Sequence, residues 1–319
     1  MKISSKALII TVNFKSAECT VRFLSSASRL DGFSGCDWIV VDNGSQDGSI
    51  ERIGEAVSGH TNIELLASPE NLGYFGAATW ALRHYRSLHL DDAPNWVIVC
   101  NNDIVFEDAG FLRRLLDRDP DAVGMIAPSI LSALTGHDAN PSIAQRPSRF
   151  RMMRYRMWLS NYYAMWFKQW LSPLVRKGLR KRSGTSVTPG GNAAREIYAP
   201  HGAFMIFSRK FFEAGCYIDE GFFLYAEEFS VAEMCRKVGL PIVHDPELKV
   251  CHQEGQSSGR MLTRKIHRYQ KEGFEYALAR HEDGYPELGD VLREKESAQT
   301  DACPDLVSLS GDISGDGTR

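Results

Sequence analysis

Short apolar runs alternate with amphipathic stretches along the first half of the chain. The runs are rich in Val and Ile and continuous, which is typical of strands buried on both faces of a sheet. The predicted strands are 7–14, 38–41, 63–67, 96–100 and 123–127, and the predicted helices are 16–27, 49–57, 77–88 and 109–116. This alternation predicts an α/β fold, in which helices cover both faces of a parallel sheet.

The second half of the chain predicts fewer elements. Residues 198–207 have strand character, and residues 262–280 are expected to be helical. A helix is also predicted over 227–238, because its buried stripe recurs at helical spacing and Gly239 provides a C-terminal stop. The stripe consists of Val231, Met234, Cys235 and Val238.

The end of the chain differs in composition from the rest. From about residue 297 it is rich in Ser, Gly and Asp, which predicts disorder. The expected organisation is a single domain, 1–280, with an insert at about 140–195 and an extension, 281–319. Residues 183–194, rich in Gly, Ser and Pro, are expected to form a mobile loop.

Composition narrows the class of protein. The chain has 319 residues, 43% hydrophobic and 24% charged, with a net charge of −3, which is ordinary for a soluble globular protein. The N-terminus lacks the apolar core of a signal peptide, and no run is long enough to predict a membrane-spanning helix. The seven cysteines are scattered without CxxC spacing, so neither a disulfide framework nor a zinc site is expected. A reducing, cytoplasmic setting fits this pattern.

Polar residues close two of the predicted strands. Asp42-Asn43-Gly44-Ser45 follows the strand 38–41, and Asn101-Asn102-Asp103 follows the strand 96–100. The carboxyl ends of parallel strands share one edge of a sheet, where ligands bind. Asp103 can hold a hard divalent cation through oxygen, and Asp42 can accept a hydrogen bond from the imide of a nucleobase. The alternative for both residues is an Asx turn.

Three further features carry candidate chemistry. Glu227 and Glu228 open a predicted helix, where one carboxylate can act as a general base or both can simply favour the helix dipole. His252 ends an apolar run and is either a metal ligand or an ordinary hydrogen-bonded residue, with His201 and His244 as weaker candidates. The glycines of 71–76 permit close backbone approach to a ligand. Neither a GxGxxG nor a P-loop motif is present, which argues against a dinucleotide or ATP-hydrolysing site.

The interval between Asp138 and Glu196 contains no acidic residue. Its basic residues include Arg146, Arg149, Arg151, Arg154, Arg156, Lys168, Arg176, Lys177, Arg180, Lys181 and Arg182. Interleaved with them are Met152, Met153, Trp158, Tyr162, Tyr163, Met165, Trp166, Phe167 and Trp170. This composition fits either an anionic membrane surface or a helical insert whose aromatic residues pack on the main domain. No nucleic-acid partner is expected, because no binding motif is present.

The order of these motifs, across about residues 6–280, resembles glycosyltransferase family 2, and most closely its bacterial rhamnosyltransferase-like branch. The matching motifs are Thr11-Val12-Asn13, Asp42-Asn43-Gly44-Ser45, Asn71-Leu72-Gly73, Asn101-Asn102-Asp103, His201-Gly202-Ala203, Phe222-Phe223-Leu224-Tyr225, Glu227-Glu228 and His252. The resemblance implies a GT-A fold, which is Rossmann-like with a mixed, mainly parallel sheet. It also implies inverting transfer of a rhamnose-like or other hexose from a nucleotide-diphosphate donor. The implied acceptor is a glycan or lipid-linked glycan of cell-surface polysaccharide synthesis.

Roles for individual residues follow from the same resemblance. Thr11, Asn13 and Asp42 would line the nucleoside pocket, while Asn71, Gly73, Asn101 and Asn102 would lie near the donor. Asp103, joined by His252, would hold Mg²⁺ or Mn²⁺. Glu228, beside Glu227, matches the general base, and the implied location is cytoplasmic, with peripheral attachment to the inner face of the membrane left open.

The chain also departs from the family pattern. Glu228 replaces an Asp, Ser230 replaces an acidic residue, Asn101 replaces the first carboxylate of the DxD turn, and Ala77-Ala78-Thr79 replaces Gly-Asn-Asn. These changes leave open a non-catalytic member of the fold that binds a nucleotide sugar or glycan. A sugar-phosphate nucleotidyltransferase fits less well, because the loop 13–18 lacks its glycine-rich, basic character.

Overall fold

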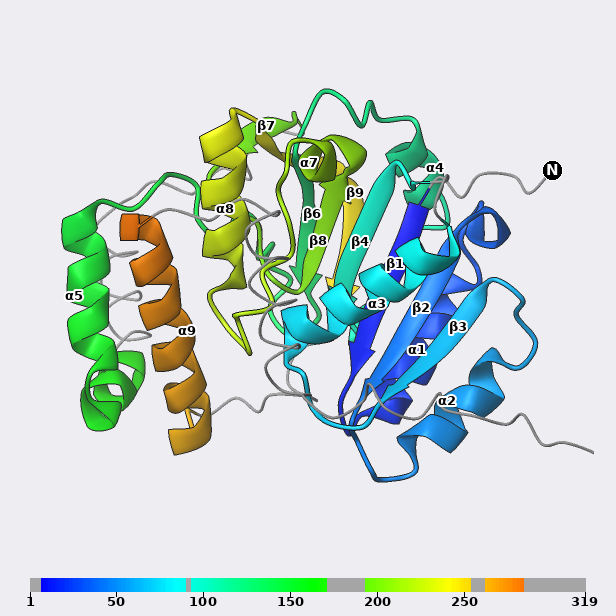
Figure 1. Cartoon of the computed structure of the whole chain (residues 1–319), viewed down its shortest axis with the longest axis horizontal. Coiled ribbons are helices and arrows are strands. Elements are labelled where there is room, and N and C mark those ends of the chain that lie inside the picture. The colour runs from blue at the N-terminus through cyan, green and yellow to red at the C-terminus, as the bar shows by residue number, and fades with distance from the viewer. Residues whose placement is uncertain (1–6, 90–92, 171–192, 254–261, 284–319) are drawn as a thin grey trace, which may run out of the picture. The chain divides into compact units, whose positions relative to one another are not determined.

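A mixed nine-stranded sheet forms the centre of the computed structural model, which describes residues 7–89, 93–170, 193–253 and 262–283 (Figure 1). All of these residues belong to one compact unit, Met1–Tyr285. The strands are β1 (Ala7–Asn13), β2 (Asp37–Asn43), β3 (Ile63–Ser68), β4 (Trp96–Asn101), β5 (Ile104–Val105), β6 (Met125–Ser132), β7 (Arg195–Ile197), β8 (Phe204–Ser208) and β9 (Ile242–His252).

The strand order is β3-β2-β1-β4-β8-β6-β9-β5, with β7 paired to β9. The first four strands in this order are parallel, as the βαβ alternation predicts. β8 is antiparallel to both β4 and β6, and β6 is again parallel to β9. The carboxyl ends of β1, β2, β4, β6 and β9 therefore lie at one edge of the sheet, where β8 begins.

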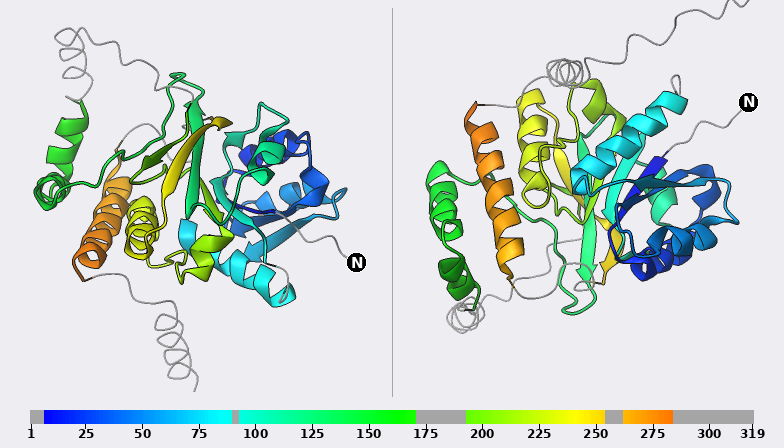
Figure 2. Two further views of the ribbon diagram at one scale, coloured as in Figure 1. Left: turned by 90° about the horizontal axis from the view of Figure 1, so that it is seen from above. Right: turned by 60° about the horizontal axis from the view of Figure 1, so that its bottom comes forward.

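Helices cover both faces of this sheet, as expected (Figures 1 and 2). Those described are α1 (Ala17–Ala27), α2 (Ser49–Val57), α3 (Tyr74–Leu88), α4 (Phe111–Leu116), α5 (Arg149–Leu159), α7 (Arg209–Glu213), α8 (Glu227–Val238) and α9 (Arg264–Asp283). Residues 33–35 form a short 3₁₀ helix, and residues 162–170 are also helical.

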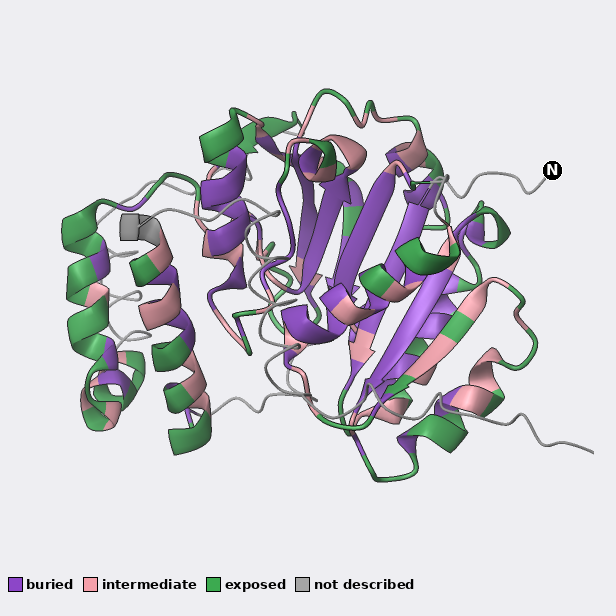
Figure 3. Ribbon diagram, in the orientation of Figure 1, coloured by how far each residue is buried: buried purple, intermediate pink, exposed green. Residues whose placement is uncertain are grey.

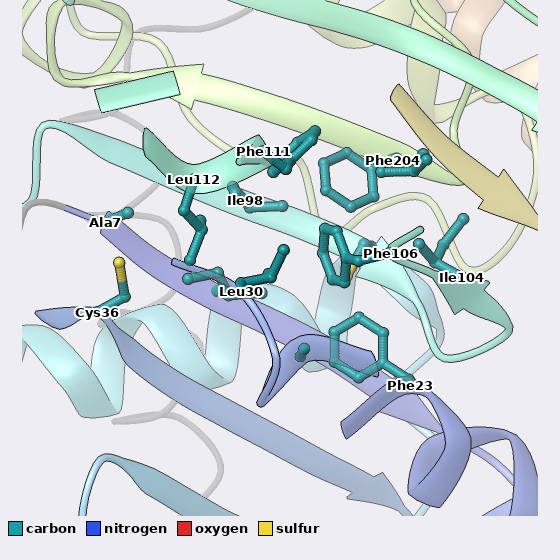
Figure 4. Close-up of a cluster of buried hydrophobic side chains, with 14 of the residues drawn as sticks. Ala7, Phe23, Leu30, Cys36, Ile98, Ile104, Phe106, Phe111, Leu112 and Phe204 are labelled. Carbon is teal, nitrogen blue, oxygen red and sulfur yellow. The ribbon is translucent and has the colours of Figure 1, made fainter. Parts of the chain in front are cut away.

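Alternate side chains of the central strands supply the core on one face of the sheet. There Phe23 of α1 and Phe111 of α4 pack with Ile98 and Phe204 around Phe106 (Figure 4). The central strands are buried almost throughout, whereas β3 at the edge is mixed (Figure 3). Burial on both faces explains why these strands are continuous apolar runs in the sequence.

Most predicted elements are present, with shifted ends. Residues 49–57 and 227–238 are helices with the predicted bounds, and α3 begins three residues before the predicted start, at Tyr74 after Gly73. The strand predicted over 198–207 was wrong in its first half, because the chain turns at His201 and β8 begins only at Phe204. β9, eleven residues long, was not predicted beyond a short run before His252, because Asp245, Pro246 and Glu247 interrupt its pattern.

Part of the insert forms a helical layer on the main domain. α5 packs on α9, which in turn contacts α8, and Met152, Leu159 and Met165 share a buried cluster with Leu262, Phe274 and Leu278. The expected mobile loop, apart from Ala193 and Ala194, and the expected disordered tail lie outside the described residues, as do Arg176 to Arg182. Within the described part of the chain, no helix is long and apolar enough to cross a membrane. Its six cysteines are all buried and free.

Candidate active site

A buried polar network joins the ends of β1, β2 and β4. Asn13 Nδ2 donates to Asp42 Oδ1 at 2.7 Å, and the Ser45 hydroxyl and backbone N–H donate to the same carboxylate at 2.5 and 3.1 Å. Asn102 Nδ2 donates to Asn13 Oδ1 at 3.1 Å and to the Thr20 hydroxyl at 2.9 Å. Asp42, Asn13 and Asn102 thus fix the strand ends relative to one another, and the Asp42 side chain has no solvent contact.

Besides Asn13 and Asp42, two further predicted donor residues are buried in this structure. Thr11 lies within β1 and is 1% exposed, beside Cys100 of β4. Asn102 is 4% exposed, and its amide is hydrogen-bonded to β1 and α1. Asn101, the last residue of β4, is more exposed, and its backbone N–H donates to Ala203 O at 2.9 Å.

Asn43 holds the donor-side loop and was not singled out from the sequence. Its side chain donates to Asn71 Oδ1 at 3.1 Å and to Gly73 O at 3.0 Å, and it accepts from the Leu72 N–H at 2.8 Å. Gly73 has φ +78°, and a Cβ there would lie 2.4 Å from Phe223 O. Asn71 and Gly73 are therefore fixed between the end of β2 and the 222–226 turn. The signal for Asn43 was its place in the Asp42-Asn43-Gly44 turn.

Asp103 and His252 meet although they are far apart in sequence. β5 pairs with β9 with Ile104 opposite His252, which brings His252 Nε2 to 3.0 Å from Asp103 Oδ1. His252 Nδ1 is buried and has no hydrogen-bond partner among the described residues. The His201 ring lies 6.2 Å from that of His252.

A carboxylate oxygen beside an imidazole nitrogen is a donor set that fits a divalent metal such as Mn²⁺. The described residues contain no cluster of three His, Cys, Asp or Glu side chains suited to a metal ion. A metal held by Asp103 and His252 would therefore complete its coordination with ligand or water oxygens.

Glu227 and Glu228 begin α8 after a strained turn. Tyr225 and Ala226 have φ of 73° and 69°, a left-handed conformation that is rare for residues other than glycine. The Tyr225 N–H donates to Glu227 Oε1 at 2.8 Å, which holds that carboxyl group against the turn. Gly273 of α9 permits close contact, since a Cβ there would lie 2.3 Å from Tyr225 O. The close contact with Gly273 and the hydrogen bond from Tyr74 N–H to Phe223 O thus hold the turn that precedes the two carboxyl groups.

A cavity of about 380 Å³ opens at this edge of the sheet. Asn101, His201, Glu227 and Glu228 line it together, and Tyr74, Tyr155 and Phe274 contribute aromatic walls. Tyr155 comes from α5 and Phe274 from α9, so the insert helps to build the cavity. Those two residues were missed because their patterns indicate only helix packing.

A second cavity, of about 330 Å³, lies beside the loops that follow β1 and β2. It is formed by the loop after β1 and the start of α2, with Lys15, Ser16, Asp47, Ser49 and Arg52 among its lining residues. Its walls are mostly polar or charged. The candidate site is thus one edge of the sheet, with a polar cavity at the loop after β1 and an aromatic cavity at the start of α8.

The two carboxyl groups of α8 are perturbed by their surroundings. Burial, and secondarily the charge of Glu228, raises the pKa of Glu227 to about 8. Burial also raises the pKa of Glu228 above its usual range. Glu227 is therefore largely protonated at neutral pH, and burial makes the carboxylate of Glu228 a stronger base than an exposed one.

Stability should consequently fall with rising pH because of Glu227. Between the unfolded pKa near 4.5 and the folded pKa near 8, the native state holds the extra proton, so deprotonation favours unfolding. Glu227→Gln keeps the acceptor for the Tyr225 N–H and removes this dependence. From pH 5 to pH 8, we expect the free energy of unfolding of the variant to rise by on the order of 2–4 kcal/mol relative to that of the parent chain.

Denaturant unfolding at both pH values measures this gain. Glu55→Gln, which changes an exposed residue of α2, is the control and should unfold in parallel with the parent chain at each pH. If the free energy of unfolding of Glu227→Gln changes with pH as that of the parent chain does, Glu227 is ionised in the folded protein at neutral pH.

Comparison with solved structures finds similar chains at low sequence identity, and the alignment with GalNAc-T7 supports a shared fold. GalNAc-T7, solved with UDP, GalNAc and Mn²⁺, aligns with a TM-score of 0.53 and 11% identity over 94% of this chain and 58% of that chain. A mannosyltransferase of Pyrobaculum calidifontis, PcManGT, solved with GDP-Man and Mn²⁺, aligns with a TM-score of 0.48 and 13% identity. That alignment covers 92% of this chain and 80% of that chain. TarS 1–349 of S. aureus aligns with a TM-score of 0.49 and 11% identity over 86% of this chain and 73% of that chain.

Sequence comparison identifies the family. No curated protein matches this chain significantly. The family model described as "Glycosyl transferase family 2" matches residues 8–213, which is more than half of the chain. With the mixed sheet and its covering helices, this match confirms the expected GT-A fold. The chain belongs to glycosyl transferase family 2.

Proposed function

We propose that this protein transfers a sugar from a nucleotide-diphosphate donor to a hydroxyl group of a glycan or lipid-linked glycan acceptor, in cell-surface polysaccharide synthesis. The observation that carries this proposal is the shared cavity of Asn101, His201, Glu227 and Glu228 at the sheet edge that also bears Asp103 and His252. A base and a candidate metal site thus lie at the same edge, on the side where open α/β sheets bind nucleotides.

The donor would lie along the carboxyl ends of β1, β2 and β4. Asp42, with Asn13, would face the nucleobase after rearrangement of the Ser45 hydroxyl that now occupies its oxygen. Asn71, Gly73 and Asn101 would flank the remainder of the donor. GalNAc-T7, which shares the fold, is solved with UDP and Mn²⁺, and this supports a nucleotide diphosphate as the ligand.

Asp103 and His252 would hold Mg²⁺ or Mn²⁺. When bound, the metal supplies positive charge that stabilises a leaving diphosphate. The buried Asp103 oxygen and the His252 nitrogen are fixed by the β5–β9 pairing before any ligand arrives. The chain would therefore offer the metal two preorganised ligands.

Glu228 would act as the general base. Its carboxylate takes the proton of the acceptor hydroxyl, and the oxygen forms a bond to the anomeric carbon as the bond to the diphosphate breaks. Attack opposite the leaving group inverts the anomeric configuration. Because burial keeps Glu227 protonated, no second carboxylate charge lies beside the reacting oxygen.

Binding without catalysis is the second candidate. Ser230 replaces an acidic residue of the family pattern, and its hydroxyl donates to Glu227 O at 2.8 Å, so it closes the first turn of α8 and adds no carboxylate to the cavity. Saturable donor binding without turnover would favour this function. The rhamnosyltransferase-like branch and a hexose donor remain predictions.

A thermal-shift screen of GDP, UDP, dTDP and CDP, each with and without Mn²⁺, tests the proposal. A ligand at about 100 times its Kd adds about 2.7 kcal/mol, which should raise Tm by about 5 °C. We expect one nucleoside to stand out and to require metal. Turnover of the corresponding sugar nucleotides then separates transferase from binding protein. No stabilisation by any of the four would contradict the proposal.

A further inference from the structure

Exposed aromatic side chains are concentrated in one short segment of the described chain. Eight of its fourteen exposed large apolar side chains lie in residues 150–170. They are Phe150, Met153, Met157, Trp158, Tyr163, Trp166, Phe167 and Trp170. Isolated exposed apolar residues are normal, but such a concentration marks an interaction surface. We call these eight residues, with Arg151 and Arg154, the α5 face.

The α5 face is separate from the packed side of the same helices. Met152, Leu159 and Met165 are buried against α9, so the structural role of the segment is already satisfied by that stripe. Phe150 and Met157 are 77% and 73% exposed on the same helix. In Figure 3 the outer side of α5 is largely exposed, and in both views of Figure 2 α9 lies on its inner side. Core packing therefore does not explain the exposed aromatic residues.

The charge of this segment has one sign. No acidic residue occurs between Asp138 and Glu196. Arg156 is paired with Glu275 of α9 at 2.9 Å, whereas Arg151 and Arg154 are exposed and have no ion pair with the described residues. Lys168 lies over the Tyr155 ring at 4.5 Å and links the 162–170 helix to α5. The surface thus combines uncompensated positive charge with Trp, Tyr and Phe.

We propose that the α5 face docks on the surface of an anionic lipid bilayer. Trp and Tyr favour the boundary between headgroups and acyl chains, and Arg side chains favour anionic headgroups. Exposed Trp and Tyr beside Arg, on helices whose other side packs on the main domain, are suited to interfacial attachment. The positive charge of the α5 face complements an anionic surface, whereas two copies of the same basic face would repel each other, and this selects the bilayer over a second copy.

The position of the α5 face relates membrane docking to the cavity. Tyr155 is a half-buried residue of α5, and the centre of its ring lies 5.0 Å from that of Phe274 of α9. Both rings line the cavity that contains Glu228. Docking through α5 therefore holds the cavity beside the bilayer, where an acceptor carried on a lipid would be within reach.

Vesicle flotation of the full chain tests docking directly. Vesicles of phosphatidylglycerol mixed with phosphatidylcholine should carry the protein with them, and vesicles of phosphatidylcholine alone should carry much less. Trp166→Ser combined with Trp170→Ser should lower partitioning by about 10-fold or more. Arg151→Gln combined with Arg154→Gln should lower it by about 10- to 30-fold and weaken its dependence on salt.

Two matched double variants serve as controls. Leu88→Ser with Ile50→Ser also removes two exposed apolar side chains, and Arg29→Gln with Arg113→Gln also removes two exposed charges, both away from α5. These controls should float like the parent chain. Thermal unfolding should be nearly unchanged for all four variants, because the substituted side chains are exposed.

Two outcomes would overturn the proposal. One is equal flotation of the parent chain and both α5-face variants, or no flotation of the parent chain. The other is a dimer in lipid-free solution that only the Trp166/Trp170 variant dissociates, since this would assign the face to a second copy. None of these measurements depends on sugar transfer, so the proposal stands or falls independently of the proposed reaction.

Discussion

Replacing Glu228 by Gln should lower the rate of sugar transfer by about 10²- to 10⁴-fold, which is the usual contribution of a positioned general base. Glu228 lines the cavity, and burial raises its pKa toward the value at which a carboxylate abstracts protons effectively near neutral pH. Gln has nearly the same size and retains an acceptor oxygen but cannot take up the proton. The loss should therefore appear in kcat and not in the affinity for the donor.

Three companion measurements make this result specific to the base. Glu51→Gln, which changes an exposed Glu in the first turn of α2, should transfer at the parent rate. Glu228→Asp restores a carboxylate one methylene shorter, as in the family pattern, and should recover part of the rate. The thermal shift caused by the nucleotide should be the same in all three variants. A Glu228→Gln protein that retains nearly full activity would exclude Glu228 as the base.

The sequence predicted the parallel half of the sheet well because its signals are local. A buried strand that ends in Asp42-Asn43 or Asn101-Asn102-Asp103 can be recognised from a few residues, and βαβ connectivity then places both ends at one edge. The bounds of α8 followed from its apolar stripe and from Gly239. These inferences need no information about distant parts of the chain.

The antiparallel half depends on contacts that no local pattern encodes. β8 inserts between β4 and β6, and the long β9 pairs with β6 across a register shift at Pro128 and Ser129. The pairing of β5 with the end of β9 then brings His252 beside Asp103. The sequence proposed both residues as ligands but gave no distance between them, because that distance is set by strand register.

Burial is the second property that the sequence did not reveal. Asp42 and Asn102 have polar side chains typical of exposed turns, yet both lie inside a hydrogen-bonded network. Glu227 and Glu228 are adjacent residues whose pKa values rise because the folded surroundings bury them, and a local pattern does not encode this burial. The composition of the insert likewise did not reveal which of its side chains are buried, since it was compatible with helix packing or with an interaction surface. In the structure α5 packs on α9 with one side and is exposed on the other.

Replacing Asp103 by Asn should abolish the part of donor binding that requires metal. The amide keeps the size of the buried side chain beside His252 but removes its negative charge, and neutral amide oxygens bind divalent cations more weakly than carboxylates. A metal contributes several kcal/mol to charge stabilisation, so we expect transfer to fall by about 10²- to 10³-fold. Addition of a chelator to the parent chain should reproduce the effect.

Asp42→Asn distinguishes this metal effect from general damage to the site. Asp42 is bound by Asn13 and Ser45 and has no contact with His252, so its substitution should weaken nucleotide binding equally with and without Mn²⁺. Asp103→Asn should instead retain the metal-free thermal shift and lose only the increment that Mn²⁺ adds. If both variants lose the same increment, Asp103 supports the donor pocket in the same way as Asp42, and the metal must be held elsewhere. If Asp103→Asn keeps the full Mn²⁺ increment, the pair of Asp103 and His252 is a structural contact between β5 and β9.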